Sequence, residues 1–159
     1  MEDPDSSNAD LRGETAAQQA DRNWTELLQE MRVTQMGVQI LTGFLLTLPF
    51  QARFGLLDDV QRVGYLVVVT LSVLATAFMI APVAYHRWVF GTRRKAWLVR
   101  VGHRMVGMGL AALVGCVSGV IWLVFDMVVN RTVSTIMGVA LFLVYAILWW
   151  GVPLRSRGA

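Results

Sequence analysis

The placement of charges constrains this chain most, because four long stretches contain no charged residue and no histidine. Each stretch has 20 to 23 consecutive residues free of Asp, Glu, Lys, Arg and His. About 20 apolar residues in a helix that rises 1.5 Å per residue cross the roughly 30 Å of hydrocarbon in a bilayer. The stretches are residues 33–52, 63–85, 105–125 and 132–154. The sequence therefore predicts an all-α membrane protein with four transmembrane helices.

The overall composition excludes several other classes of protein. Hydrophobic residues make up 55% of the chain and charged residues 16%, against about 45–50% and 25% in ordinary soluble domains. We therefore do not expect a soluble enzyme or a nucleic-acid-binding domain. The single cysteine, Cys116, cannot form an intrachain disulfide, so a disulfide-rich scaffold is excluded too. We expect no catalytic residue in the chain. We also expect no cleavable signal peptide before the first stretch.

The domain prediction has three parts. Residues 1–22 are polar and acidic, which predicts a disordered cytoplasmic tail; docking of this tail to a basic partner is the less favoured alternative. Residues 23–154 form the transmembrane domain, with spans at about 33–50, 63–85, 105–125 and 133–152, and residues 155–159 form a short basic tail. Short connections join spans one to two and three to four, which favours two antiparallel hairpins.

A short amphipathic helix is predicted just before the first span. Asn23 followed by Glu26 three residues later is typical of a capping box at a helix start. Trp24, Leu28 and Met31 then share one face of a helix. We expect this helix to lie at the membrane surface and to run into the first span.

The basic residues predict the orientation of the chain. Residues 86–104 contain six basic residues and no acidic one. With both termini and this segment in the cytoplasm, the inner side carries eleven basic residues, and only Arg53, Arg62 and Arg131 lie outside. The positive-inside rule favours this topology, so we expect a multi-pass membrane protein with both termini in the cytoplasm.

The same basic segment is a candidate contact for anionic lipid headgroups, at about 1 kcal/mol per basic residue near the surface. The residues concerned are Arg87, Arg93, Arg94, Lys95, Arg100 and Arg104. His86 and His103 flank the segment, but each is followed by an arginine that would oppose a bound cation. We therefore expect no metal, haem or other cofactor.

Span three contains small residues at every fourth position: Gly107, Ala111, Gly115 and Gly119. Such a stripe lets two helices approach closely. The favoured interpretation is packing within one copy of the chain. The alternative is an interface between copies in a homo-oligomer.

Span one contains polar residues on a single helix face: Arg32, Gln35, Gln39 and Thr42, with Gly43 beside them. An amide in lipid is costly unless it is hydrogen-bonded. We therefore expect this face to point into the bundle or at a partner. Hydrogen bonding between helices is the favoured role, and a polar binding site is the alternative.

Three segments carry a resemblance to a known family. Residues 26–54, 80–90 and 98–105 resemble a family of small integral membrane proteins of unknown function, found mainly in actinobacterial genomes. The resemblance implies placement in the inner membrane of a bacterium and supplies no mechanism. Some members carry a sodium:proton antiporter label, but none of the four spans contains the ionisable residue that ion relays generally use.

These observations favour a non-enzymatic accessory or scaffold protein that acts through helix packing and lipid contact. The alternative is a small oligomeric transporter or channel, with or without coupling to an ion gradient. Expected partners are the bilayer with its anionic headgroups and either a second copy or another membrane protein. A polar residue on every span would favour transport, whereas only span one has a clear polar face.

Overall fold

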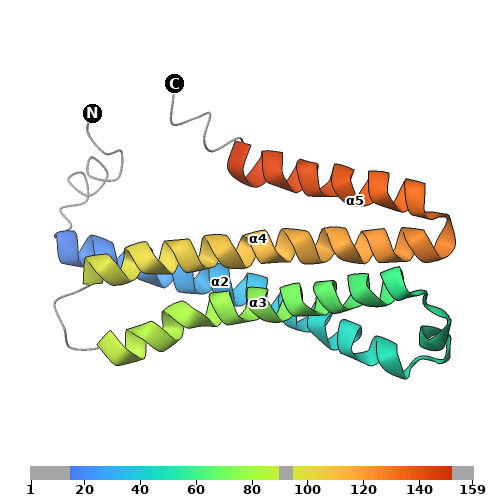
Figure 1. Ribbon diagram of the computed structural model, residues 1–159. Helices are drawn as coiled ribbons and strands as arrows, with labels where there is room; N and C mark the ends of the chain where they lie inside the picture. Colours follow the sequence, from blue (N-terminus) through green and yellow to red (C-terminus); the bar gives the residue numbers. More distant parts are fainter. Residues whose placement is uncertain (1–14, 90–94, 152–159) are drawn as a thin grey trace.

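The structure is a computed structural model that describes residues 15–89 and 95–151, and each element in these two ranges is a helix (Figure 1). The long helices are α2 (Ala16–Thr47), α3 (Asp59–Val89), α4 (Lys95–Val128) and α5 (Arg131–Ala146). Short 3-10 helices, η1 (Leu48–Phe50) and η2 (Ala52–Leu56), join α2 to α3, and a π-helical turn, η3 (Ile147–Gly151), continues α5.

Four helical segments are long and apolar enough to cross a membrane: Leu28–Phe50, Asp59–Tyr85, Val101–Val128 and Arg131–Trp149. Large hydrophobic side chains are exposed along all four, among them Phe44, Leu66, Val124 and Phe142. In water such a surface would drive aggregation, whereas hydrocarbon solvates it. The predicted number and approximate positions of the apolar helices are therefore confirmed.

The helices run side by side, and α3 packs most extensively against α4 (Figure 1). Helix α4 also contacts α5, and α2 lies mainly against α3. The α2–α3 connection and the α4–α5 turn lie at one end of the molecule, which we call the turn end. The start of α2 lies at the opposite end, and α5 runs from the turn end part of the way back toward it (Figure 1). The most extensive packing thus joins the two predicted hairpins and does not lie within either one.

The core follows a seven-residue repeat. The buried residues of α3 are spaced alternately three and four apart: Tyr65, Val68, Ser72, Ala75, Met79 and Pro82. On α4, Gly109, Cys116 and Leu123 are buried at every seventh position. A 3.5-residue period keeps one seam facing a neighbour in left-handed helix packing. Small residues on both helices account for the close α3–α4 contact.

Helix α2 begins earlier than the sequence analysis predicts. Thr15 is the N-cap: the Gln18 amide N–H donates to Thr15 Oγ1 at 3.4 Å, and the Thr15 N–H donates to Gln18 Oε1 at 2.8 Å. The cap predicted at Asn23 is therefore wrong, because Asn23 lies within α2. The intervening Ala and Gln residues are good helix formers, so residues 16–22 are helical. Residues 1–14 of the predicted disordered tail lie outside the described residues.

The turn end of α2 is fixed by a tyrosine from α3. The Tyr65 hydroxyl donates to the Leu45 carbonyl at 2.9 Å, which also accepts the backbone N–H of Leu48 at the end of the helix. The Phe54 ring packs edge-on against Tyr65, with ring centroids 5.1 Å apart. These contacts hold the connection between α2 and α3 against the bundle.

Candidate functional site

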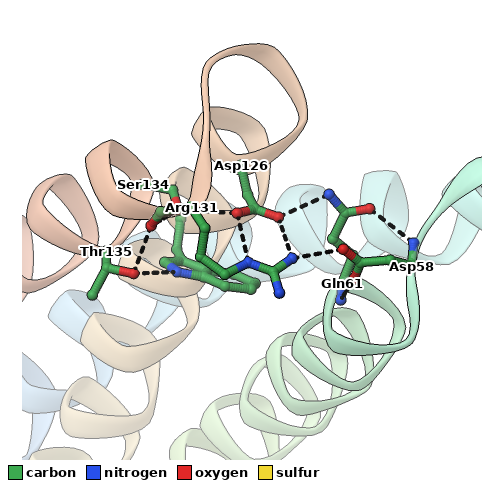
Figure 2. Close-up of polar contacts among 7 residues, drawn as sticks. Asp58, Gln61, Asp126, Arg131, Ser134 and Thr135 are labelled. Atoms are coloured by element: carbon green, nitrogen blue, oxygen red, sulfur yellow. Dashed lines mark hydrogen bonds and ion pairs between the residues drawn. The ribbon is translucent and has the colours of Figure 1, made fainter.

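The most extensive polar arrangement among the described residues lies at the turn end and joins α3, α4 and α5 (Figure 2). We call it the Asp126 cluster; its members are Asp58, Gln61, Asp126, Arg131 and Ser134. Arg131 binds Asp126 through two contacts, from Nε to Oδ1 at 3.0 Å and from Nη2 to Oδ2 at 2.8 Å. Arg131 Nη2 also lies 2.7 Å from Asp58 Oδ2. One guanidinium thus joins carboxylates from two parts of the chain.

Local sequence positions each member of this cluster. Asn130 caps α5 by accepting a hydrogen bond from the Val133 amide at 3.0 Å. The short turn before it brings Arg131, the first residue of α5, beside Asp126 near the end of α4. Asp58 and Gln61 form a reciprocal capping pair at the start of α3, at 2.8 and 3.1 Å. The side-chain amide of Gln61 also donates, from Nε2, to Asp126 Oδ2 at 2.8 Å.

The charged groups of the Asp126 cluster are paired with one another. The Asp126 side chain is 2% exposed and accepts hydrogen bonds from Arg131, Gln61 and Ser134. The Gln61 backbone N–H and the adjacent Arg131 guanidinium lower the pKa of Asp58. Arg131 also lies over the Trp122 ring, 5.8 Å from its centroid. Because its donors and acceptors are paired with one another, this cluster is suited to holding helix ends together.

The sequence analysis missed this cluster. Arg131 appears there only in the count of basic residues that predicts the orientation. Two local signals were present: Gln61 follows Asp58 by three residues, and a capping Asn130 separates Asp126 from Arg131. The contact between Arg131 and Asp58 spans 73 residues, so no local pattern could have indicated it.

The predicted polar face of span one does not point into the bundle. The buried residues of α2 are Met31, Val38 and Leu45, and the polar face lies beside this seam. Arg32 and Gln39 are exposed, whereas Gln35 and Thr42 are half-buried.

Hydrogen bonding differs along this face. The Thr42 hydroxyl donates to the Val38 carbonyl of its own helix at 2.7 Å. Within the described part of the chain, the side-chain amides of Gln35 and Gln39 have no hydrogen-bond partner. The other spans therefore do not supply the partners that the interhelical interpretation requires.

The predicted small-residue stripe divides between two environments. A Cβ added at Gly119 would lie 2.5 Å from Val68 Cγ2, and one at Gly115 would lie 3.1 Å from Leu71 Cδ1. Gly107 has nothing within 4 Å, and Ala111 is exposed. The structure thus brings Gly115 and Gly119 against α3 and leaves the other two members of the stripe turned away from it.

Most side chains of the basic segment are not among those that the structure describes. The side chains of Arg87, Lys95 and Arg100 are outside the description. Arg93 and Arg94 belong to the segment between the two described ranges. Arg104 and His103 are exposed near the start of α4. Among the described residues, no group of three His, Cys, Asp or Glu side chains could hold a metal ion.

Two apolar hollows adjoin α2. One, of about 400 Å³, lies between α2, α4 and α5 and is lined by residues that include Gly37, Leu41, Val114 and Tyr145. The other, of about 390 Å³, lies at the turn end and includes Leu45, Phe54 and Val124. Both linings are mainly hydrocarbon, so they suit acyl chains or apolar side chains rather than a polar solute.

Comparison with known families gives a match over most of the chain. A family of unknown function, DUF6328, matches residues 13–153. The chain belongs to the DUF6328 family. No curated protein and no solved structure matches the chain at a significant level. Membership in DUF6328 confirms the coarser part of the predicted resemblance, a family of unknown function, and assigns no activity.

Proposed function

We propose that this DUF6328 protein is a non-enzymatic accessory or scaffold protein of the membrane, which acts by lateral association of α2 with another transmembrane helix. The observation that carries this proposal is the position of Gln39. Gln39 is the central residue of the candidate span Leu28–Phe50, and it is exposed on the surface of the bundle.

An amide at that depth has no route to water. Six residues separate it from Val33, where the charge-free stretch begins, and eleven separate it from Phe50. At 1.5 Å per residue it therefore lies about 9 Å and about 16 Å from the two ends of the apolar segment. A glutamine side chain is too short to reach the interface from there. Leaving a buried polar group unpaired costs free energy, so the exposed amide favours a state in which a second helix supplies the hydrogen bond.

The interior of the bundle supports an accessory role more than transport. The buried polar residues of the described bundle are Ser72, Ser118 and Ser134. Ser72 donates to a carbonyl of its own helix at 2.8 Å, Ser134 belongs to the Asp126 cluster, and the Ser118 hydroxyl has no partner in this part of the chain. The charged residues of the Asp126 cluster are paired at one end of the molecule. The bundle thus encloses one unpaired hydroxyl and no unpaired charge among the described residues, and the exposed polar face points outward.

The basic residues of the 86–104 segment complete the proposal. We place this end of the molecule in the cytoplasm, at the inner membrane of a bacterium, where the six basic residues would contact anionic headgroups. Lipid contact would fix the depth and tilt of the bundle. The exposed amide of α2 would then lie at a constant depth for its partner.

The test is the size of the native assembly after solubilisation in a mild detergent. We expect the wild-type protein to migrate as an assembly larger than the single chain. Gln39→Leu should accumulate normally and migrate as the single chain, because it replaces the amide with an apolar side chain of similar size. Ile40→Leu, at the same depth on a different face, is the matched control and should behave as wild type.

Two results would contradict this proposal. One is a wild-type protein that migrates as a single chain from native membranes. The other is a Gln39→Leu variant with an unchanged assembly. Sodium-dependent proton movement into vesicles that contain the purified protein, above the leak of protein-free vesicles, would instead favour the transporter alternative.

A further inference from the structure

The exposed face of α2 has the chemistry of a surface that pairs with itself, and this inference rests on the proposed lateral association. The part of this face that can pair with itself comprises Gln35, Gln39 and Gly43. Arg32, about two turns before Gln39, carries a charge that would oppose its equivalent. Arg32, Gln39 and Gly43 are exposed, and Gln35 is half-buried. An added Cβ at Gly43 would meet nothing within 4 Å. We propose that α2 binds α2 of a second copy of this chain, with the Gln39 amides hydrogen-bonded to each other within the bilayer.

The first argument is the chemistry of the amide. A glutamine side chain carries both a carbonyl acceptor and an NH₂ donor. Two glutamines can therefore satisfy each other reciprocally, which a serine bonded to its own helix or a lone arginine cannot do. A partner that presents only donors or only acceptors would leave part of each amide unpaired in hydrocarbon.

The second argument is depth. Copies of one membrane protein insert with the same orientation, so a two-fold axis that relates them lies along the membrane normal. Such an axis places each residue of α2 at the same depth as its equivalent. Gln39 then faces Gln39 without any adjustment of register, whereas an unrelated helix would need a polar residue at this one level.

The third argument is steric. Gly43 lies one turn after Gln39 on the same side of α2, since residues four apart are neighbours on a helix. Small residues at a membrane interface let backbones approach closely, and polar side chains then bond across the contact. With open space at Gly43, a second α2 can come near enough for the short amides to meet.

The opposite flank of α2 is less suited to this contact. It carries Gly37, Leu41 and Val33, which line the hollow shared with α4 and α5. A helix seated there would meet an apolar surface and would leave Gln39 exposed to lipid. The polar face is thus the side of α2 that gains most from a second copy.

Cysteine cross-linking in vesicles tests this arrangement. The purified full-length protein is reconstituted in phosphatidylglycerol–phosphatidylethanolamine vesicles at low protein density and oxidised. The wild-type chain contains only the buried Cys116 and provides the background. Gln39→Cys should give a disulfide-linked dimer well above that background. Ile40→Cys is the matched control: it is exposed, lies at the same depth and points about 100° away on the helix, so it should stay near background.

A second measurement does not depend on a new cysteine. Single-molecule photobleaching of labelled protein in the same vesicles should show two-step traces for the wild type. Gln39→Leu should weaken dimerisation roughly tenfold, as expected for loss of interhelical hydrogen bonds in lipid. Gln39→Asn, which keeps an amide, should retain more of the dimer than Gln39→Leu.

The outcomes separate this inference from the proposed function. Equal cross-linking at positions 39 and 40, or a purified wild-type protein that bleaches in one step, would overturn pairing with a second copy. If the native assembly still depends on Gln39 in that case, lateral association stands and its partner is another membrane protein. If the native assembly does not depend on Gln39, both proposals fail.

Discussion

The Asp126 cluster and the polar face of α2 place polar side chains in an apolar molecule in opposite ways. In the cluster, Arg131, Gln61 and Ser134 donate to one carboxylate that is almost completely enclosed. On α2, the Gln39 amide is exposed within the span and has no partner among the described residues. Polar groups that bond to one another stabilise the fold, whereas those left open at this depth favour association.

The largest expected effect is on the unfolding temperature, when an arginine is replaced by methionine in the Asp126 cluster and, for comparison, on the polar face of α2. Arg131→Met removes the guanidinium from the enclosed Asp126 carboxylate and should lower the unfolding midpoint in detergent by on the order of 10 °C. Arg32→Met, on the exposed face of α2, should change the midpoint by no more than about 1 °C. Equal midpoints for the two variants would remove the structural role of the cluster. Combining Arg131→Met with Asp126→Asn should recover part of the loss, since no charge is then left enclosed.

The next largest effect concerns the stability change on enlarging two glycines of α4, one packed against α3 and one turned away from it. Gly119→Leu introduces a side chain whose Cβ alone would lie 2.5 Å from Val68 Cγ2, so it should destabilise the fold by about 1–3 kcal/mol through overpacking. Gly107→Leu, where nothing lies within 4 Å, should be tolerated. Reversible unfolding of both variants measures the difference. A Gly107→Leu variant as unstable as Gly119→Leu would indicate that the small-residue stripe packs as a unit.

Gln39→Leu should have little effect on the stability of the single chain. Its amide makes no bond within the described bundle, so the free energy of unfolding should change by less than about 0.5 kcal/mol. The measurement is unfolding at a detergent-to-protein ratio high enough to separate copies. A loss of about 2 kcal/mol or more under these conditions would show that Gln39 bonds within the chain, as the interhelical interpretation predicted.

The smallest effect is a dependence on pH that only one of the two regions should show. The pKa of Asp58 is lowered below its ordinary 3.8, so this group favours the folded state above pH 3.8 and loses that effect as the pH falls through its folded value. Hydrogen exchange in residues 48–58 should therefore increase as the pH falls below 3.8. Amides do not titrate in this range, so α2 association should not change. Asp58→Asn keeps a capping residue and should remove the pH dependence; an unchanged dependence in that variant would assign it to another group.

The sequence could predict the four apolar helices because a charge-free stretch of bilayer length is rare in a soluble protein, and this chain contains four of them. It could not predict which face of each helix is buried. Almost every residue within a span is apolar, so the seven-residue period of Val68, Ala75 and Pro82 on one side of α3 does not stand out.

The stripe from Gly107 to Gly119 illustrates a second limit. A step of four residues turns about 40° beyond a full helical turn, so three steps rotate the stripe by about 120°. One neighbouring helix cannot contact all four members. The polar face of α2, with spacings of three and four, stays together on one side of its helix.

The central claim is that the polar face of α2 lies between two copies of the chain. Pulsed electron paramagnetic resonance tests it with one spin label per chain, in lipid vesicles. Leu46 is exposed and lies on the same side of α2 as Gln39, so labels there should be close together, as expected for helices whose axes are about 8–10 Å apart. Labels at the exposed Phe142 of α5 should be clearly farther apart. No dipolar coupling at position 46, or a shorter distance at position 142 than at position 46, would contradict the claim.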